Sequence, residues 1–351
     1  MHKLSLIFDG SADCEAHDVA ALRFAASRIA SFLQLAYDEA EASPGANMDS
    51  YCIPMSTLSF LQARTLGLSN ESQFWGGMAP HAFVATKLIS HPLWSSDAVR
   101  PEGWLPVDGV EALTLPGYSV FSRDDAWASG CHLLQSGEVR IKLPFARGGN
   151  GQAVVRTKDA LGCWLATLSD VSITRGLVLE RNLVESVTCS VGSSSLPGHD
   201  IAYQGSQRTI KDPDGNTVYG GSSLRVRRGT LQMLSEAVSE TTVSMAMAYD
   251  RLLRGRYAVL ASRRNYDVIV GVDSNGNKHT GVLEQSWRFG GASMAELLAF
   301  EWLQQNPQCA EVVAETVESY EGLPAPSTAV VYADGGSGSP QKFARVLLGG
   351  H

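Results

Sequence analysis

Apolar and polar residues alternate along this chain with two periods, one of two residues and one close to 3.6 residues. The shorter period is typical of a strand with one buried face, and the longer period of an amphipathic helix. Short apolar runs bounded by turn residues predict strands at 4–8, 117–122 and 176–180. Helical spacing predicts helices over 17–37, 83–90, 123–134, 158–169, 228–253 and 293–305.

Residues 51–67 combine two elements. A short strand comes first, and a helix follows. We expect Ser56 or Thr57 to cap the start of this helix and Gly67 to end it. Because Ser and Thr accept hydrogen bonds from the first free amides of a helix, either residue suits that role.

The second half of the chain is richer in strands. Residues 181–219 are predicted to be mainly strands, separated by the turn sequences SLPGHD and DPDGN. Residues 266–287 are predicted to be two strands around an Asn275-Gly276 turn. The tail from 327 holds a strand, a Gly/Ser loop and a last short strand. Since no internal repeat is found, this order predicts a mixed α/β enzyme built of several subdomains.

The bulk properties narrow the function classes. The chain has 351 residues, 44% hydrophobic and 18% charged, with a formal net charge of -8. General nucleic-acid binding is not expected, because it needs basic patches that neutralise phosphate. No apolar run of about 18 residues occurs, so no membrane span is expected. The cysteines form no CxxC pair and favour reduced thiols in a cytoplasmic protein: Cys14, Cys52, Cys131, Cys163, Cys189 and Cys309.

The segment VRIKLPFARGGNGQAVV, residues 139–155, places four turn residues between two β-rich arms. One interpretation is an ordinary hairpin with Lys142 facing solvent. The other is a glycine loop over phosphates, with Lys142 directed at their oxygens, because glycines allow close backbone approach and consecutive amides can bind an anion. The segment alone leaves both interpretations open.

Asp267 and Glu284 lie on the two strands joined by the Asn275-Gly276 turn. The midpoint of their numbers falls on that turn, so we expect them to face each other. Two such carboxylates repel unless a cation lies between them, and Mg²⁺ suits that position. Ser286 and Arg288 follow Glu284 at i+2 and i+4 and so face the same side. A solvated outer face is the alternative.

The sequence resembles the ATP-grasp enzymes over residues 87–291. Four segments carry the resemblance: VRIKLPFARGGNGQAVV, GLVLERNL, YDVIVGVDSNG and VLEQSWRFGG, the last similar to a Glu-x-Asn-x-Arg-Pro-Gly signature. The chain is also similar to an uncharacterised proteobacterial family within that superfamily. The resemblance implies an α/β ATP-grasp fold: an N-terminal α/β domain over 1–115, a small lid subdomain over 116–183 and a C-terminal antiparallel-sheet subdomain over 184–351.

The resemblance also implies binding roles. Lys142 contacts the α- and β-phosphates of ATP, and Lys87 is the earlier lysine that such enzymes use. Glu180 faces the adenine amino group, and Glu185 is the candidate for the ribose hydroxyls. The remaining contacts come from the mobile glycine loop and the hinge backbone: Gly148, Gly149, Asn150, Gly151, Arg181 and Leu183.

In the same resemblance, Asp267, Glu284 and Ser286 hold Mg²⁺. Ser286 stands where the family has Asn, and Phe289-Gly290-Gly291 stands where it has Pro-Gly, which leaves the number of metal ions open. Arg288, with Lys142 the expected catalytic residue, stabilises the acyl phosphate or the tetrahedral oxyanion.

The implied activity is an ATP- and Mg²⁺-dependent ligase that joins a small carboxylate to an amine and releases ADP and phosphate. The alternatives are a kinase-like phosphotransferase and a non-catalytic nucleotide-binding protein. The expected partners are small-molecule carboxylate and amine substrates, and a homodimer is compatible with the sequence, which says little about assembly.

Further residues could line a substrate pocket. His17, Asp18, Trp75 and His81 are such residues in the N-terminal part, where a structural role is favoured for the histidines. Gln204, Gln207, Arg208 and Arg225 are the others, and an exposed β-meander explains them equally well. The sequence YGGS at 219–222 is a candidate for a second loop that closes on the site.

Overall fold

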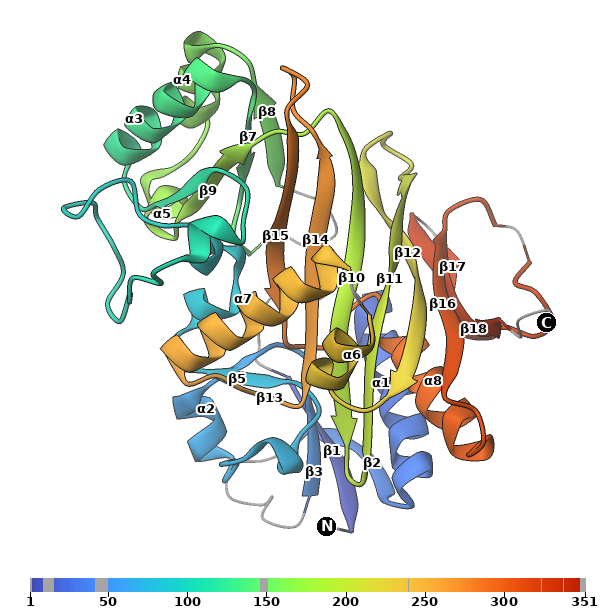
Figure 1. Ribbon diagram of the computed structural model, residues 1–351. Coiled ribbons are helices and arrows are strands. Elements are labelled where there is room, and N and C mark those ends of the chain that lie inside the picture. Colours follow the sequence, from blue (N-terminus) through green and yellow to red (C-terminus); the bar gives the residue numbers. More distant parts are fainter. Residues whose placement is uncertain are drawn as a thin grey trace.

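The computed structural model describes residues 2–8, 16–41, 50–145, 151–238, 240–322, 324–336 and 338–347. A tall twisted sheet runs through the molecule, with a smaller sheet and its helices at the upper left of the view and the N-terminal strands at the bottom (Figure 1). Among the described helices, none combines the length and the apolar content that a membrane crossing requires.

The tall sheet has eight antiparallel strands in the order β15-β14-β10-β11-β12-β16-β18-β17. Its strands are β10 (Glu185–Leu196), β11 (His199–Lys211), β12 (Thr217–Arg228), β14 (Arg263–Val272), β15 (Lys278–Ser286), β16 (Glu311–Ser319), β17 (Val330–Gly336) and β18 (Ser339–Leu347). Helices cover both of its faces, so the sheet is the central layer of the molecule.

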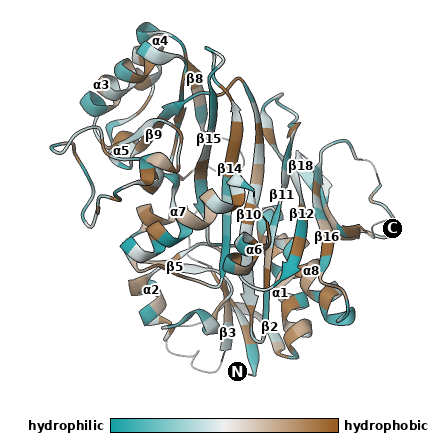
Figure 2. Ribbon diagram, viewed as in Figure 1, coloured by the Kyte–Doolittle hydropathy of each residue, from teal (hydrophilic) through white to brown (hydrophobic). Residues whose placement is uncertain are grey.

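The two faces of the tall sheet follow the alternation of side chains along each strand. On β11, Ile201 and Tyr203 join the core beneath α1 (Ala16–Leu33) and α8 (Ser293–Gln305), whereas Ala202 joins the core beneath α6 (Leu231–Ala237) and α7 (Thr241–Tyr257). Successive side chains of a strand point to opposite faces, which explains the division. Apolar and polar positions are accordingly mixed along these strands (Figure 2).

The N-terminal part adds two small sheets. Strand β1 (Lys3–Ile7) pairs in parallel with both β2 (Ala36–Glu41) and β3 (Ser50–Pro54). The other sheet joins β13 (Leu260–Ala261), β5 (Gly77–Ala79) and β4 (Leu58–Ser59). Helix α2 (Phe60–Thr65) and the 3-10 turns η1 (Glu71–Gln73), η2 (Ala82–Ala85), η3 (Lys87–Ser90) and η4 (Val110–Ala112) complete this part.

The smaller sheet at the upper left has the order β6-β9-β7-β8, and its strands are β6 (Gly117–Val120), β9 (Leu177–Arg181), β7 (Val139–Lys142) and β8 (Gln152–Val155). Its helical elements are α3 (Arg123–Leu133), η5 (Leu134–Ser136), α4 (Lys158–Ala166) and α5 (Asp170–Thr174). Val120, Ile141, Leu161 and Leu179 belong to a separate buried cluster, so this unit has a core of its own. By contrast, the N-terminal strands and the tall sheet share one core.

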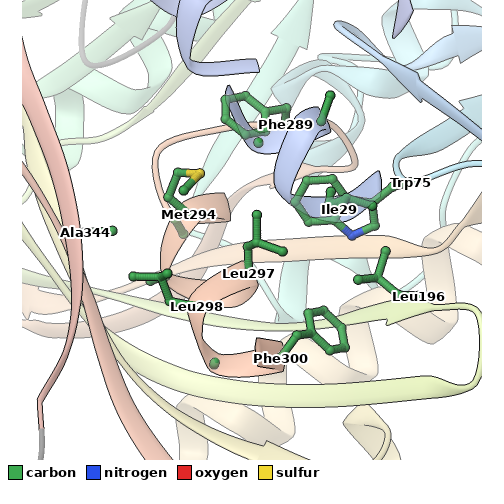
Figure 3. Packing of buried hydrophobic residues seen from close by; sticks show 14 of the residues in the cluster. Ile29, Trp75, Leu196, Phe289, Met294, Leu297, Leu298, Phe300 and Ala344 are labelled. Carbon is green, nitrogen blue, oxygen red and sulfur yellow. The ribbon is translucent and has the colours of Figure 1, made fainter. Parts of the chain in front are cut away.

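The shared core lies where α1, α8 and the tall sheet meet (Figure 3). Ile29 of α1, Leu297 of α8 and Ala344 of β18 belong to this one cluster, so the two ends of the chain pack together. The predicted fold class is confirmed: a mixed α/β chain with a small sheet unit and a large antiparallel sheet. This is the arrangement that the resemblance to ATP-grasp enzymes implies.

Several predicted element boundaries are wrong. The helix expected over 17–37 ends at Leu33, because Gln34 adopts a φ of 56° and the chain then forms β2. The helix after β3 is capped by Ser59, whose side chain accepts from the amide of Gln62, and Ser56 and Thr57 lie before it. Residues 83–90 form the two 3-10 turns η2 and η3 in place of a helix.

Three further predictions for the second half need correction. The helix expected over 228–253 is two helices, α6 and α7, and α6 begins only after its cap, Thr230. Residues 219–222 are part of strand β12, so they are no separate closing loop. Strand β16 was not predicted. The helix over 293–305 and the strands around the Asn275-Gly276 turn are confirmed.

Candidate active site

A cleft of about 830 Å³ lies between the tall sheet, the smaller sheet and the first turn of α1. Its lining residues come from distant parts of the chain, among them Lys142 on β7, Asp267 on β14 and Asp18 on α1. The lining is rich in charged side chains, so the cleft suits a polar, ionic ligand.

Asp267 and Glu284 face each other across β14 and β15, as predicted from the turn between them. The ladder next to the turn pairs Val272 with Lys278, and a regular continuation would bring Leu283 opposite Asp267. A bulge between Asp267 and Val268 shifts the register by one residue and restores the Asp267–Glu284 pair. The two carboxylates therefore meet because of a local irregularity that the sequence did not reveal.

Asp267 accepts two side-chain hydrogen bonds on Oδ1, one from Gln207 Nε2 at 2.6 Å and one from Asn265 Nδ2 at 2.8 Å. Burial and the nearby charge of Glu284 raise the pKa of Asp267 to about 7. A carboxylate with a pKa raised by a second carboxylate is a site where a cation relieves repulsion.

Glu284 lies at the open side of the same pair, with 39% of its side chain exposed, and Lys87 Nζ is 3.1 Å from its Oε2. Burial alone would raise the pKa of Glu284, but the charge of Lys87, supported by Lys142, holds that pKa below its usual value. Glu284 is therefore ionised at neutral pH and already attracts cations.

The predicted metal ligands fit Mg²⁺. Glu284 and Ser286 lie two residues apart on β15, and Ser286 is opposite Asn265 of β14. The described residues hold no cluster of three or more His, Cys, Asp or Glu side chains placed for a metal. Two carboxylates and a hydroxyl suit a hard ion that completes its shell with water and phosphate oxygens, as Mg²⁺ does.

Lys142 forms a buried ion pair with Glu180, with 2.6 Å between Nζ and Oε1 and both side chains at most 6% exposed. His91 Nε2 lies 3.1 Å from the other carboxylate oxygen of Glu180. Burial would raise the pKa of Glu180, but Lys142 and His91 lower it to about 2. The sequence did not predict that these candidates for phosphate and adenine contacts pair with each other, nor that His91 joins them.

The other predicted cofactor residues lie as follows. Arg181 and Leu183 line the cleft beside Glu180. Glu185 is exposed at the start of β10, where 186–188 line the cleft. Gly151 is described, with a φ of 63°, whereas Gly148, Gly149 and Asn150 lie outside the described residues.

A buried network, missed in the sequence, supports the metal strand. Arg263 Nη2 and Nε lie 2.6 Å and 3.0 Å from the two carboxylate oxygens of Glu296. The Tyr203 hydroxyl lies 2.8 Å from Glu296 Oε1 and 3.1 Å from Asn265 Oδ1. Arg263 Nη1 also donates to the carbonyl of Arg288. One internal ion pair thus positions both Asn265, next to Asp267, and the backbone of Arg288.

Arg288 lines the cleft, and its Nη1 donates to the carbonyl of Phe289 at 2.7 Å. The ring of Phe289 packs on Trp75 with centroids 6.3 Å apart, inside the core cluster (Figure 3). Phe289 therefore anchors the segment that carries Arg288, at the position where the family signature has proline.

A second charged group lines the cleft at α1. Lys342 Nζ lies 2.9 Å from Asp18 Oδ1 and 3.3 Å from Glu318 Oε1, and only 8% of the Lys342 side chain is exposed. His17 and Asp18, named from the sequence as pocket candidates, both line the cleft. Lys342 and Glu318 were missed, because nothing in the sequence relates β16 and β18 to α1.

The other polar candidates divide between the cleft and the framework. Gln207 reaches Asp267, whereas Gln204 donates to Glu240 and Arg225 pairs with Glu311. Three more make framework contacts: Trp75 is fully buried, His81 stacks on Phe83, and Arg208 donates to the carbonyl of Gly220.

These features define the chain as an α/β protein whose tall sheet and smaller sheet border a charged cleft. The cleft brings together Ser286 and these charged candidates: Lys87, Lys142, Glu180, Asp267, Glu284 and Arg288. The family model described as "Protein of unknown function (DUF3182)" matches residues 6–345, and the chain belongs to this family. No curated protein matches the chain significantly.

Solved structures with a similar arrangement include two amino-acid ligases. D-alanyl-alanine synthetase A from Vibrio cholerae is 9% identical, with a TM-score of 0.44 over 83% of this chain and 89% of that one. D-alanine–D-alanine ligase from Bacillus anthracis is 12% identical, with a TM-score of 0.47 over 87% and 95%. The biotin carboxylase domain of Hydrogenobacter thermophilus 2-oxoglutarate carboxylase is 11% identical, with a TM-score of 0.49 over 98% and 86%. At these values, function has to be inferred from the site's own residues.

Proposed function

We propose that this protein is an ATP-dependent ligase that activates a small carboxylate as an acyl phosphate and transfers the acyl group to an amine. The observation that carries the proposal is the Asp267–Glu284 pair, which shares one cleft with two buried lysines and Arg288. Paired carboxylates beside lysines and an arginine are the groups that a magnesium-bound nucleotide needs.

In this proposal, Asp267, Glu284 and Ser286 hold Mg²⁺, which neutralises phosphate charge when bound. Lys142 leaves Glu180 and contacts phosphate oxygens, and Lys87 leaves Glu284 and contacts them too. These exchanges keep each lysine next to negative charge throughout, so neither ammonium is left buried without a partner.

The chemistry proceeds in two steps. A substrate carboxylate oxygen bonds to the γ-phosphorus as the bond to ADP breaks. The amine then attacks the acyl carbon, phosphate leaves, and the amine loses a proton. In this proposal Arg288 stabilises the developing oxyanion, since a guanidinium is a permanent and bidentate donor. Asp18 and Lys342 offer further charged contacts in the cleft, and the charge of Arg288 also acts on Asp18, so we place the small-molecule substrate beside these groups.

The test is an ADP-release screen with Mg-ATP and panels of amino acids and small carboxylic acids. We expect ADP release that requires an acid and yields an amide. Lys142→Ala and Glu284→Ala should abolish it while circular dichroism reports a folded chain. Wild-type turnover in either variant would refute the site, and a stable phosphate ester as product would identify a phosphotransferase instead.

A further inference from the structure

A second cavity of about 880 Å³ lies between the segment 91–118, the end of α3 and the β14–β15 turn. Among the described residues, only Arg181 borders both this cavity and the cleft. Its wall carries basic groups from four regions, His91, Arg100, His132, Arg181 and His279, together with the acidic Asp108, Glu111 and Asp273. A volume of this size holds a small metabolite.

Two nitrogens of the cavity wall have no hydrogen-bond partner among the described residues, His91 Nδ1 and Arg181 Nη1. Both side chains are at least 95% buried. Asp273 lies near Arg181, but its Oδ2 already contacts His279 at 3.0 Å and Asn277 Nδ2 at 3.2 Å, and its Oδ1 accepts from the amides of Asn275 and Asn277. Buried polar groups without partners are rare and costly, so they indicate a missing ligand atom.

The two nitrogens specify the ligand's chemistry. Arg181 has only donors and therefore takes an anionic oxygen. Glu180 is ionised, so His91 Nε2 donates to it, and Nδ1 is the ring nitrogen left to contact a ligand. Both unpartnered nitrogens are buried within the wall, so a ligand reaches them only when these side chains turn towards the cavity.

We propose that this cavity is a binding site for a small oxyanion, either a carboxylate or phosphate. A ligand bound in this cavity influences the cleft through His91. His91 contacts Glu180, and Glu180 pairs with Lys142. The ligand and the nucleotide therefore alter each other's affinity by the same factor. This coupling rests on the proposed function, whereas binding of the oxyanion does not.

The test is titration calorimetry on the full, nucleotide-free chain at constant ionic strength, with inorganic phosphate, malate or succinate. We expect one saturable site, either for phosphate or for the two dicarboxylates, whichever source is correct. Arg181→Met and Arg100→Met should each weaken binding, Arg181→Met at least tenfold. Arg156→Met, which removes an exposed arginine of the smaller sheet unit, should leave binding unchanged.

Arg181 also borders the cleft, so Arg181→Met alone does not tell which of the two cavities holds the oxyanion. Lys142→Met separates the two cases, because Lys142 lines the cleft and not the second cavity. Binding that persists in Lys142→Met and weakens in Arg100→Met supports the second cavity. Binding lost in Lys142→Met and kept in Arg100→Met would overturn it, as would the absence of saturable binding by phosphate and by the two dicarboxylates. Should Arg181→Met fail to fold, Arg100→Met still decides. Oxyanion binding without any ADP release refutes only the proposed ligase activity.

Discussion

Replacing Lys142 with methionine isolates one buried charge pair of the cleft. Methionine keeps most of the length of the side chain and removes the ammonium that lies 2.6 Å from Glu180. Among the described residues, Glu180, with 1% of its side chain exposed, then keeps only His91 as a partner. Breaking a buried pair from one side leaves an uncompensated charge, so the variant is expected to be less stable than the wild type.

The structure sets the size of this effect. The pKa of Glu180 falls from 4.5 to about 2 although burial raises it, and each unit corresponds to about 1.36 kcal/mol, so the net stabilisation of the ionised form is roughly 3 kcal/mol. The charge of Lys142 is the largest single favourable cause. We therefore expect Lys142→Met to lower the free energy of unfolding by roughly 2–3 kcal/mol at pH 7, within the stability of an ordinary domain.

The pH dependence follows from the same shift. The folded pKa of Glu180 lies below its unfolded value, so the stabilisation is complete above about pH 4.5 and is lost as the pH falls towards about 2. Urea unfolding of the wild type between pH 5 and pH 2.5 should follow this loss. In Lys142→Met the Glu180 contribution to that slope should be much smaller.

The double variant Lys142→Met/Glu180→Gln is the matched control. It removes the buried charge that the single variant leaves behind, so it should recover most of the lost stability at pH 7. A loss below 1 kcal/mol in Lys142→Met, or no recovery in the double variant, would refute the view that Lys142 chiefly balances Glu180 in the nucleotide-free protein.

Three other outcomes are expected. Glu284→Gln should bring the pKa of Asp267 below about 7 in a carbon-detected NMR titration, because it removes a neighbouring charge; an unchanged pKa would mean that burial alone raises it. Mg²⁺ should raise the melting temperature more at pH 8 than at pH 5, since Asp267 loses its proton between these values; equal shifts would contradict a site at Asp267. Phe289→Ala should lower the free energy of unfolding in urea by about 3 kcal/mol, because packing on Trp75 is lost. It should also weaken turnover, because Phe289 holds the segment that carries Arg288. A loss below 1 kcal/mol would argue against this role of Phe289.

The parts of the site that the sequence predicted are those set by short-range patterns. Asp267 and Glu284 share a hairpin, and the turn between them fixes their register to within one residue. The final shift of the register by one residue comes from a bulge, which the turn sequence does not predict. Similarly, the predicted bounds of α8 are correct. The helix predicted for α1 is too long, because the strand β2 after Gln34 begins with apolar residues.

The parts that the sequence could not predict depend on contacts between distant segments. His91, Lys142 and Glu180 lie on a loop and two strands that only the folded chain brings together. The same holds for Lys342 with Asp18, which joins β18 to α1. The sequence shows which residues are charged but not which residues they pair with. In this protein the pairing determines which charges are available to a ligand.

The shared core of α1, α8 and β18 has a consequence for how the protein is made in the cell. Ile29 is synthesised long before Leu297 and Ala344, which belong to the same buried cluster. The apolar face of α1 therefore stays open for most of translation, while the smaller sheet can close on its own core. Long-range contacts of this kind slow folding and expose the nascent chain to aggregation, so chaperones are expected to bind the N-terminal segment during synthesis.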